Sequence, residues 1–182
     1  EILSVANGFS RQFLPNVDEE PVHNSIQGEL FTPHFVWANV DNDNEIFQKV
    51  LKVINWLTHK KNIHPSDIVV LTPTHDEGWQ LVRLFEENHY QINHVFEDDS
   101  SYRRNKKSFW MGDSRLKMCT IHSFKGWELL NVILLIPQNG NDPKTDFLVY
   151  TSITRTRQNL IVFNRNDRYN EFGTKFPTLK WN

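Results

Sequence analysis

The sequence predicts an α/β fold with a doubly wound, mostly parallel sheet flanked by helices. Segments whose apolar residues recur with helical spacing alternate with short apolar runs, which is typical of βαβ units. Two of these runs, residues 68–71 and 132–136, are continuously apolar, as expected for strands covered on both faces. The chain has 182 residues, of which 38% are hydrophobic and 13% aromatic. This length and composition fit one domain with a substantial core, so we expect residues 1–182 to form a single domain.

The N-terminal half begins with a helix within residues 1–15, because apolar side chains recur there at helical spacing until Pro15 ends the run. Residues 16–30 form a polar linker without any period. A short strand is expected near residues 35–40, and the polar cluster at 41–44 offers N-cap side chains to the next helix. The remaining predicted elements of this half are a helix over 46–57, a strand over 68–71, a helix around 79–85 and a strand over 92–96.

The C-terminal half opens with a charged loop at residues 97–114. A strand over 116–121, a turn at Lys125 and Gly126, and a buried strand over 132–136 follow. The pattern then predicts a helix over about 146–157 and a last strand over 160–163. Residues 165–182 are a polar tail with scattered aromatic residues, to which the pattern assigns no role.

Composition and charge exclude several classes of protein. Twenty basic residues against 22 acidic ones give a formal charge of −2, so a nucleic-acid partner would require a local basic patch. One cysteine, Cys119, excludes a disulfide framework, and the eight histidines lack the spacing of a metal site. We see no signal peptide and no apolar run long enough to span a membrane, so we expect no membrane partner and a reducing, cytoplasmic setting. The chain starts at Glu1 in a predicted helix, which suggests a piece of a longer protein.

The first segment that carries chemistry runs from Thr120 to Glu128, directly after a predicted strand. It places a hydroxyl, the His122 imidazole, the Lys125 ammonium, a glycine and a carboxylate within nine residues. Such a turn can offer backbone N–H groups and Lys125 to a phosphate, while Glu128 accepts from a hydroxyl. The alternative is a polar loop with an internally bonded histidine.

The second segment runs from Tyr150 to Arg157, before the last predicted strand. On a helix, Arg155 and Arg157 would point about 200° apart, so that one faces the crevice and the other faces solvent or a carboxylate. The alternative is that both cations complement the negative end of the helix dipole. Because open α/β sheets bind ligands at the carboxyl ends of their strands, we expect both segments to lie at that edge.

Together the two segments resemble a known family. Thr-x-His-x-x-Lys-Gly-x-Glu at 120–128, followed by Tyr-x-x-x-Thr-Arg-x-Arg at 150–157, is similar to motifs V and VI of superfamily 1 helicases of the UvrD/Rep/PcrA-like group. A weaker resemblance extends over residues 67–93, and residues 2–13 resemble the helix that follows motif IV of the family. The resemblance implies a RecA-like (P-loop NTPase-type) fold and only the second, C-terminal motor domain.

The resemblance also implies roles for individual residues. Thr120 and His122, supported by Lys125, would contact the single strand. Glu128 and Gly126 would bind the nucleotide, with Glu128 on its ribose. Arg155 would be the catalytic arginine finger that reaches the γ-phosphate, with Arg157 in a supporting role.

Three departures from the family pattern bear on activity. Trp127 stands where the family usually has leucine, and it either fills an apolar slot or stacks on a base. Residues 72–74 read Thr-Pro-Thr where the family often has an arginine. No Gly-x-x-x-x-Gly-Lys-[Ser/Thr] loop occurs, so ATP and Mg²⁺ would be held mainly by the N-terminal RecA-like domain of the parent chain. We expect the fragment alone to be inactive.

A short basic loop stands in the place of a family subdomain. About 25 residues separate Asn93 from Met118, so the accessory 2B-type insertion of UvrD-like helicases is absent. Aromatic residues interleave with the cations of this loop, and together they would grip a strand through phosphates and stacked bases; the alternative is an exposed loop whose acids offset its bases. The cations are Arg103, Arg104, Lys106 and Lys107.

These observations lead to one expectation and two alternatives. We expect the second motor domain of an ATP-dependent, UvrD-like DNA helicase, with single-stranded DNA as its partner. The same fold retained as a non-catalytic docking module for nucleic acid or protein is the first alternative. An RNA helicase motor domain is the second, because superfamily 1 includes both kinds of motor.

Overall fold

The computed structural model describes residues 2–14, 34–40, 43–96, 112–124 and 127–178. Helices and strands alternate along this part of the chain, as the sequence predicts. The helices are α1 (Ile2–Phe13), α2 (Asp43–His59), α3 (His75–Glu87), α5 (Pro143–Thr154) and α6 (Asn170–Gly173). The strands are β1 (His34–Asn39), β2 (Ile68–Thr72), β3 (Ile92–His94), β4 (Leu116–Thr120), β5 (Leu129–Leu135) and β6 (Thr156–Asn164).

The six strands form one sheet in the order β1-β6-β5-β2-β4-β3, and every neighbouring pair is parallel. The register aligns Thr72 at the end of β2 with Thr120 at the end of β4. All carboxyl ends therefore meet at one edge of the sheet and all amino ends at the other. We call these the carboxyl edge and the amino edge.

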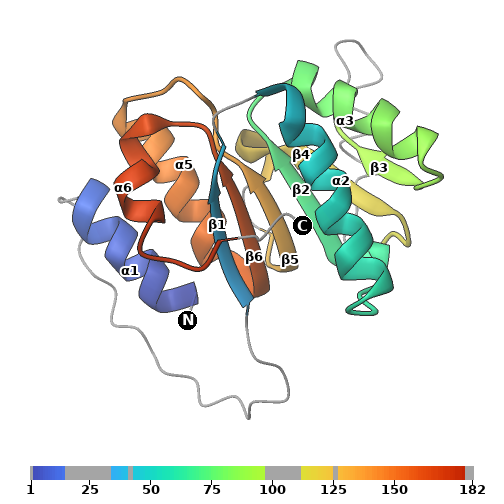
Figure 1. Ribbon diagram of the computed structural model, residues 1–182, viewed down its shortest axis with the longest axis horizontal. Coiled ribbons are helices and arrows are strands. Elements are labelled where there is room, and N and C mark those ends of the chain that lie inside the picture. The colour runs from blue at the N-terminus through green and yellow to red at the C-terminus, as the bar shows by residue number, and fades with distance from the viewer. Residues whose placement is uncertain (1, 15–33, 41–42, 97–111, 125–126, 179–182) are drawn as a thin grey trace.

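Helices cover both faces of the sheet, with α1, α5 and α6 on one face and α2 and α3 on the other (Figure 1). One buried apolar cluster lies on each side, and side chains of β2 and β5 alternate between the two clusters. Both faces of the central strands are therefore dry, which explains their continuously apolar sequences. Among the described residues, no helix combines the length and the apolar character that crossing a membrane requires.

The helix predicted over 146–157 lies at residues 143–154 instead. Asp142 caps its N-terminus by accepting from Thr145 N at 2.7 Å, and Pro143 occupies the first turn, so the helix begins earlier than its apolar pattern suggests. It ends at Arg155, whose carbonyl accepts from Leu129 N at 3.0 Å and so starts the β5–β6 ladder. Arg157 lies in β6, so the helical geometry predicted for the two arginines is wrong.

The tail beyond Asn164 is part of the core, a role its irregular sequence did not predict. A 3₁₀ turn at Asp167–Tyr169 leads into α6, and both Tyr169 and Phe172 are buried against α1 and β1. Pro177 O accepts from Trp37 N at 3.0 Å, which covers part of the outer edge of strand β1. The linker predicted at 16–30, the turn at Lys125 and Gly126, and residues 97–111 lie outside the described residues.

Candidate functional site

The residues of the two motif segments are divided between opposite edges of the sheet. Thr120 ends β4 at the carboxyl edge, and His122 follows it in the 3₁₀ turn Ile121–Phe124. Glu128 precedes β5 and Arg155 precedes β6, so both lie at the amino edge. The expectation that both segments share the carboxyl edge is therefore wrong, because the chain runs back along the sheet between residues 121 and 128.

At the amino edge, Arg157 and Glu128 form an ion pair between Nη2 and Oε1, although 29 positions separate them in the sequence. Both side chains are more than half exposed, at 57% and 56%. The hydrogen bond and the charge of Arg157 lower the pKa of the Glu128 carboxyl, and the charge of Arg155 contributes to the same shift. The pair therefore brings the two motif segments to one point on the surface.

Arg155 is the C-cap residue of α5, and its backbone N–H donates to carbonyls of the last turn. Within the described residues its guanidinium has no hydrogen bond or ion pair, and the residue is half-buried. A guanidinium whose N–H groups are not engaged within the described residues can bind phosphate oxygens in a planar, bidentate way. Together with the Glu128 carboxylate, which accepts from hydroxyls, the amino edge has the donors and acceptors that a nucleotide requires.

Trp127 is partly buried and packs against the core cluster on the α1–α5 face. Of the two roles that its sequence position allows, this contact agrees with the apolar slot rather than with base stacking.

At the carboxyl edge, the Thr120 hydroxyl bonds within its own turn. It donates to Ser123 Oγ at 2.9 Å and accepts from Ser123 N at 3.3 Å, and the residue is only 4% exposed. His122 is exposed on the same turn. In this structure Thr120 therefore shapes the turn, and His122 is the side chain that the turn presents to solvent.

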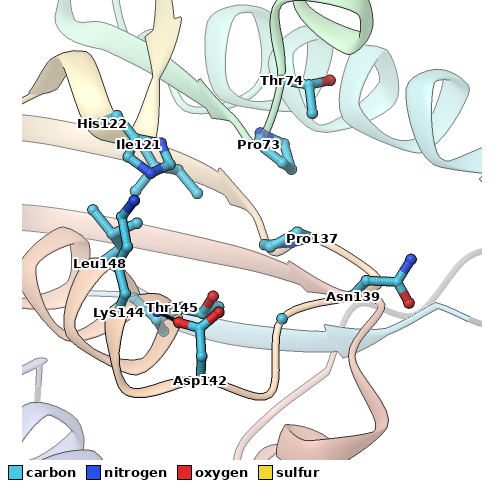
Figure 2. Close-up of a pocket in the computed structure, with 12 residues that line it drawn as sticks. Pro73, Thr74, Ile121, His122, Pro137, Asn139, Asp142, Lys144, Thr145 and Leu148 are labelled. Atoms are coloured by element: carbon cyan, nitrogen blue, oxygen red, sulfur yellow. Dashed lines mark hydrogen bonds between the residues drawn. The ribbon is translucent and has the colours of Figure 1, made fainter.

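A hollow of about 260 Å³ lies beside this turn, where loops from three strand ends meet (Figure 2). We call it the carboxyl-edge hollow. Sequence reasoning did not single out Asn139, Asp142 or Lys144 in its wall; the only trace is a polar stretch after the apolar run of β5. The hollow is lined by Pro73, Thr74, Ile121, His122, Pro137, Asn139, Gly140, Asp142, Lys144, Thr145, Leu148 and Val149.

The sequence pattern also did not predict a buried lysine at the amino edge. Lys117 in β4 is 0% exposed, and its Nζ donates to the carbonyls of Ser66 at 2.5 Å, Asp113 at 2.7 Å and Arg115 at 3.4 Å. Burial lowers its pKa. Because all its donors are used internally, we assign it to the fold rather than to ligand binding.

The other predicted site residues are not placed. Lys125, Gly126 and the loop cations Arg103, Arg104, Lys106 and Lys107 lie outside the described residues. No group of three or more His, Cys, Asp or Glu side chains within the described ranges could hold a metal ion.

The fold and its edges define a class of protein: an all-parallel, six-stranded α/β sheet flanked by helices, consistent with a RecA-like domain. Among solved structures, the chain is similar to the C-terminal domain of a possible DNA helicase from Lactobacillus plantarum WCFS1. The TM-score is 0.56 and the identity 14%, over 87% of this chain and 83% of that one, so the likeness is one of fold. No family model matches the chain, and no curated protein matches it significantly.

Proposed function

We propose that this chain is the second motor domain of an ATP-dependent, UvrD-like DNA helicase or translocase. The observation that carries the proposal is the exposed Glu128–Arg157 ion pair at the amino edge, together with the half-buried Arg155, whose charge lowers the pKa of Glu128. The fold likeness to a helicase C-terminal domain supports it independently of these residues.

At the amino edge, Arg155 is the arginine finger and Glu128 binds a ribose hydroxyl. The donor set fits a nucleotide presented by another domain. Within the described residues it offers one guanidinium without a partner and one carboxylate, and the sequence contains no phosphate-cradling loop motif. ATP with Mg²⁺, held mainly by the N-terminal motor domain of the parent, supplies the phosphoryl group that is hydrolysed. Arg155 stabilises the charge that develops on that group, an effect worth roughly 10³–10⁵ in rate for such arginines.

At the carboxyl edge, His122 contacts the single strand, and Lys125 supports it. The two edges are separated by the length of the strands, so one rigid domain links nucleotide to nucleic acid. When the cleft between the two motor domains closes on ATP, Arg155 contacts the γ-phosphate. Hydrolysis releases that contact, so the position at which the domain binds the strand shifts with each turnover. This is hinge closure driven by differential contact with ATP and ADP.

The test is ATP turnover by the full-length parent, with and without single-stranded DNA, in wild type and Arg155→Ala. We expect DNA-stimulated turnover that falls at least about 10³-fold in the variant, with strand affinity nearly unchanged. Arg83→Ala, which removes an exposed arginine of α3, is the matched control and should turn over normally.

Two results would count against the proposal. Equal loss of turnover and strand binding in Arg155→Ala would show a structural role for this arginine. A wild-type parent that binds the strand without turnover would indicate a docking module. Parallel measurements with single-stranded RNA distinguish a DNA motor from an RNA motor.

A further inference from the structure

The carboxyl-edge hollow has apolar walls. Pro73 and Pro137 line it from the ends of β2 and β5, and Ile121 and Leu148 add aliphatic surface. Figure 2 shows the two prolines one above the other, across the hollow from Ile121 and Leu148. Proline rings and aliphatic side chains offer flat, uncharged surfaces, which suit the faces of a planar, neutral ring. A volume of about 260 Å³ is small for a drug-sized ligand and suits a single ring system.

The polar groups of the hollow are divided between its sides. In the view of Figure 2, His122 and Lys144 lie on the left, Asp142 lies at the bottom and Asn139 lies on the right. Lys144 and His122 are both exposed, so they can meet an anion that passes the rim.

The negative charge of Asp142 limits where that anion can bind. One carboxylate oxygen, Oδ1, accepts from Thr145 N at 2.7 Å and caps α5. The backbone N–H groups of the first helical turn lower its pKa, so it stays ionised at neutral pH. A phosphate is therefore repelled from this helix N-terminus. Thr145 and the backbone of Lys144 already donate to the carboxylate, but its two oxygens have about four acceptor positions and can accept one more hydrogen bond from a neutral donor.

We propose that the hollow holds one base of a bound single strand and favours bases with an exocyclic amino group, which donates to Asp142. The adjoining phosphate lies on Lys144 and His122. This inference rests on the proposed function, because the strand contact at His122 brings the base to the hollow. It adds Lys144 and Asp142 to the binding residues and gives the site a chemical preference.

The test compares two strands of equal length, oligo(deoxyadenosine) and oligo(deoxynebularine), whose bases differ only in the 6-amino group. Binding to the 182-residue chain is measured by fluorescence anisotropy at low salt. We expect the amino-bearing strand to bind about five- to tenfold more tightly.

Asp142→Asn is the decisive variant. Asparagine is as good an N-cap as aspartate, but its single oxygen then caps the helix and its NH₂ group faces the base. The variant should fold with an unchanged urea midpoint and lose the preference for the amino-bearing strand. Glu87→Gln, which neutralises an exposed carboxylate of α3, should keep it. Lys144→Ala should weaken both strands alike.

The outcomes separate this inference from the proposed function. Tight binding of both strands with equal affinity would overturn the base pocket and leave the strand contact standing. A preference that survives in Asp142→Asn would also overturn the inference. If the chain binds neither strand, the strand contact of the proposed function fails, and the base pocket fails with it.

Discussion

A carboxylate paired with an arginine can bind a ligand or can stabilise the fold. The exposure of its side chain distinguishes these two roles. Glu128 has a side chain that is 56% exposed, and among the described residues its hydrogen-bond partner is Arg157. Asp146 has a side chain that is 2% exposed, and it accepts from Arg168 and from Tyr169 Oη. Glu128 therefore remains available to a ligand, whereas Asp146 holds helix α5 to the tail.

Arg157→Ala should leave the free energy of unfolding of the isolated chain unchanged within error. The pair it breaks is exposed on both sides, and exposed ion pairs are screened by solvent. Urea denaturation followed by circular dichroism measures this. A clear loss of stability would mean that the pair is a structural contact that maintains the fold.

The lowered pKa of Asp113 predicts that the free energy of unfolding depends on pH. Its carboxylate accepts from Arg115 Nε at 2.8 Å, Nη2 at 2.7 Å and N at 2.9 Å, and the Arg115 side chain is the main reason why its pKa falls from 3.8 to about 2. A pKa lowered in the folded state stabilises the protein above the unfolded value and loses that effect as the pH falls through the folded value. Asp113→Asn should therefore be less stable than wild type above about pH 4, and the gap should close between pH 4 and 2. Urea denaturation across that range tests it; a constant gap would contradict the assignment.

At the scale of elements, the carboxyl ends of β1 and β6 are held to the tail by asparagine side chains. Asn164 Nδ2 donates to Asn39 Oδ1 at 2.9 Å and to Asn170 Oδ1 at 2.9 Å, and Asn39 in turn donates to Asn170 O. Phe9, Phe13 and Phe172 pack edge to face or tilted beside this network. Helix α6 is thus joined to the sheet by polar contacts and to α1 by aromatic contacts.

Asp146→Ala tests how strongly the tail is held to α5. The change leaves the buried Tyr169 hydroxyl without its acceptor and Arg168 without its carboxylate, and we expect a loss of about 2–3 kcal/mol in the free energy of unfolding. Glu171→Gln, at an exposed carboxylate of α6, is the charge-matched control and should change little. A loss below about 1 kcal/mol would mean that the aromatic residues and the asparagine network hold the tail without a substantial contribution from Asp146.

At the scale of the whole molecule, periodicity predicted the parts of the chain that are long enough to show it. The alternation of helices and strands was confirmed because each buried strand and each helical face imposes its own spacing. The tail lacked any period because a 3₁₀ turn and a helix of four residues are too short to repeat. Strand order depends on contacts between distant segments, which local spacing does not encode.

The same distinction between local patterns and contacts of distant segments applies to the candidate site. Glu128, Arg155 and His122 stand in local motifs, so the sequence singles them out as candidates. Their distribution over two edges was not predicted, because it follows from the path of the chain between β4 and β5. The carboxyl-edge hollow was missed because the ends of β2, β4 and β5 each contribute only part of it. A site assembled from three loops has no signature in any one of them.

The chain has a net charge of −2, so its overall charge does not attract nucleic acid, and strand binding must come from local cations. The salt dependence of the binding constant gives the number of phosphate contacts that these cations make. Each phosphate contact to a single strand contributes about −0.7 to the slope of log K against log salt concentration. If the loop cations contact the strand, the doubles Arg103→Ala/Arg104→Ala and Lys106→Ala/Lys107→Ala should each make the slope shallower by about 1.4. Lys60→Ala/Lys61→Ala removes two exposed cations beyond the C-terminal end of α2 and should leave the slope unchanged. An equal effect of all three double substitutions would assign binding to the overall charge of the chain. Unchanged slopes in both loop variants would restrict the phosphate contacts to residues outside the loop, such as His122 and Lys144.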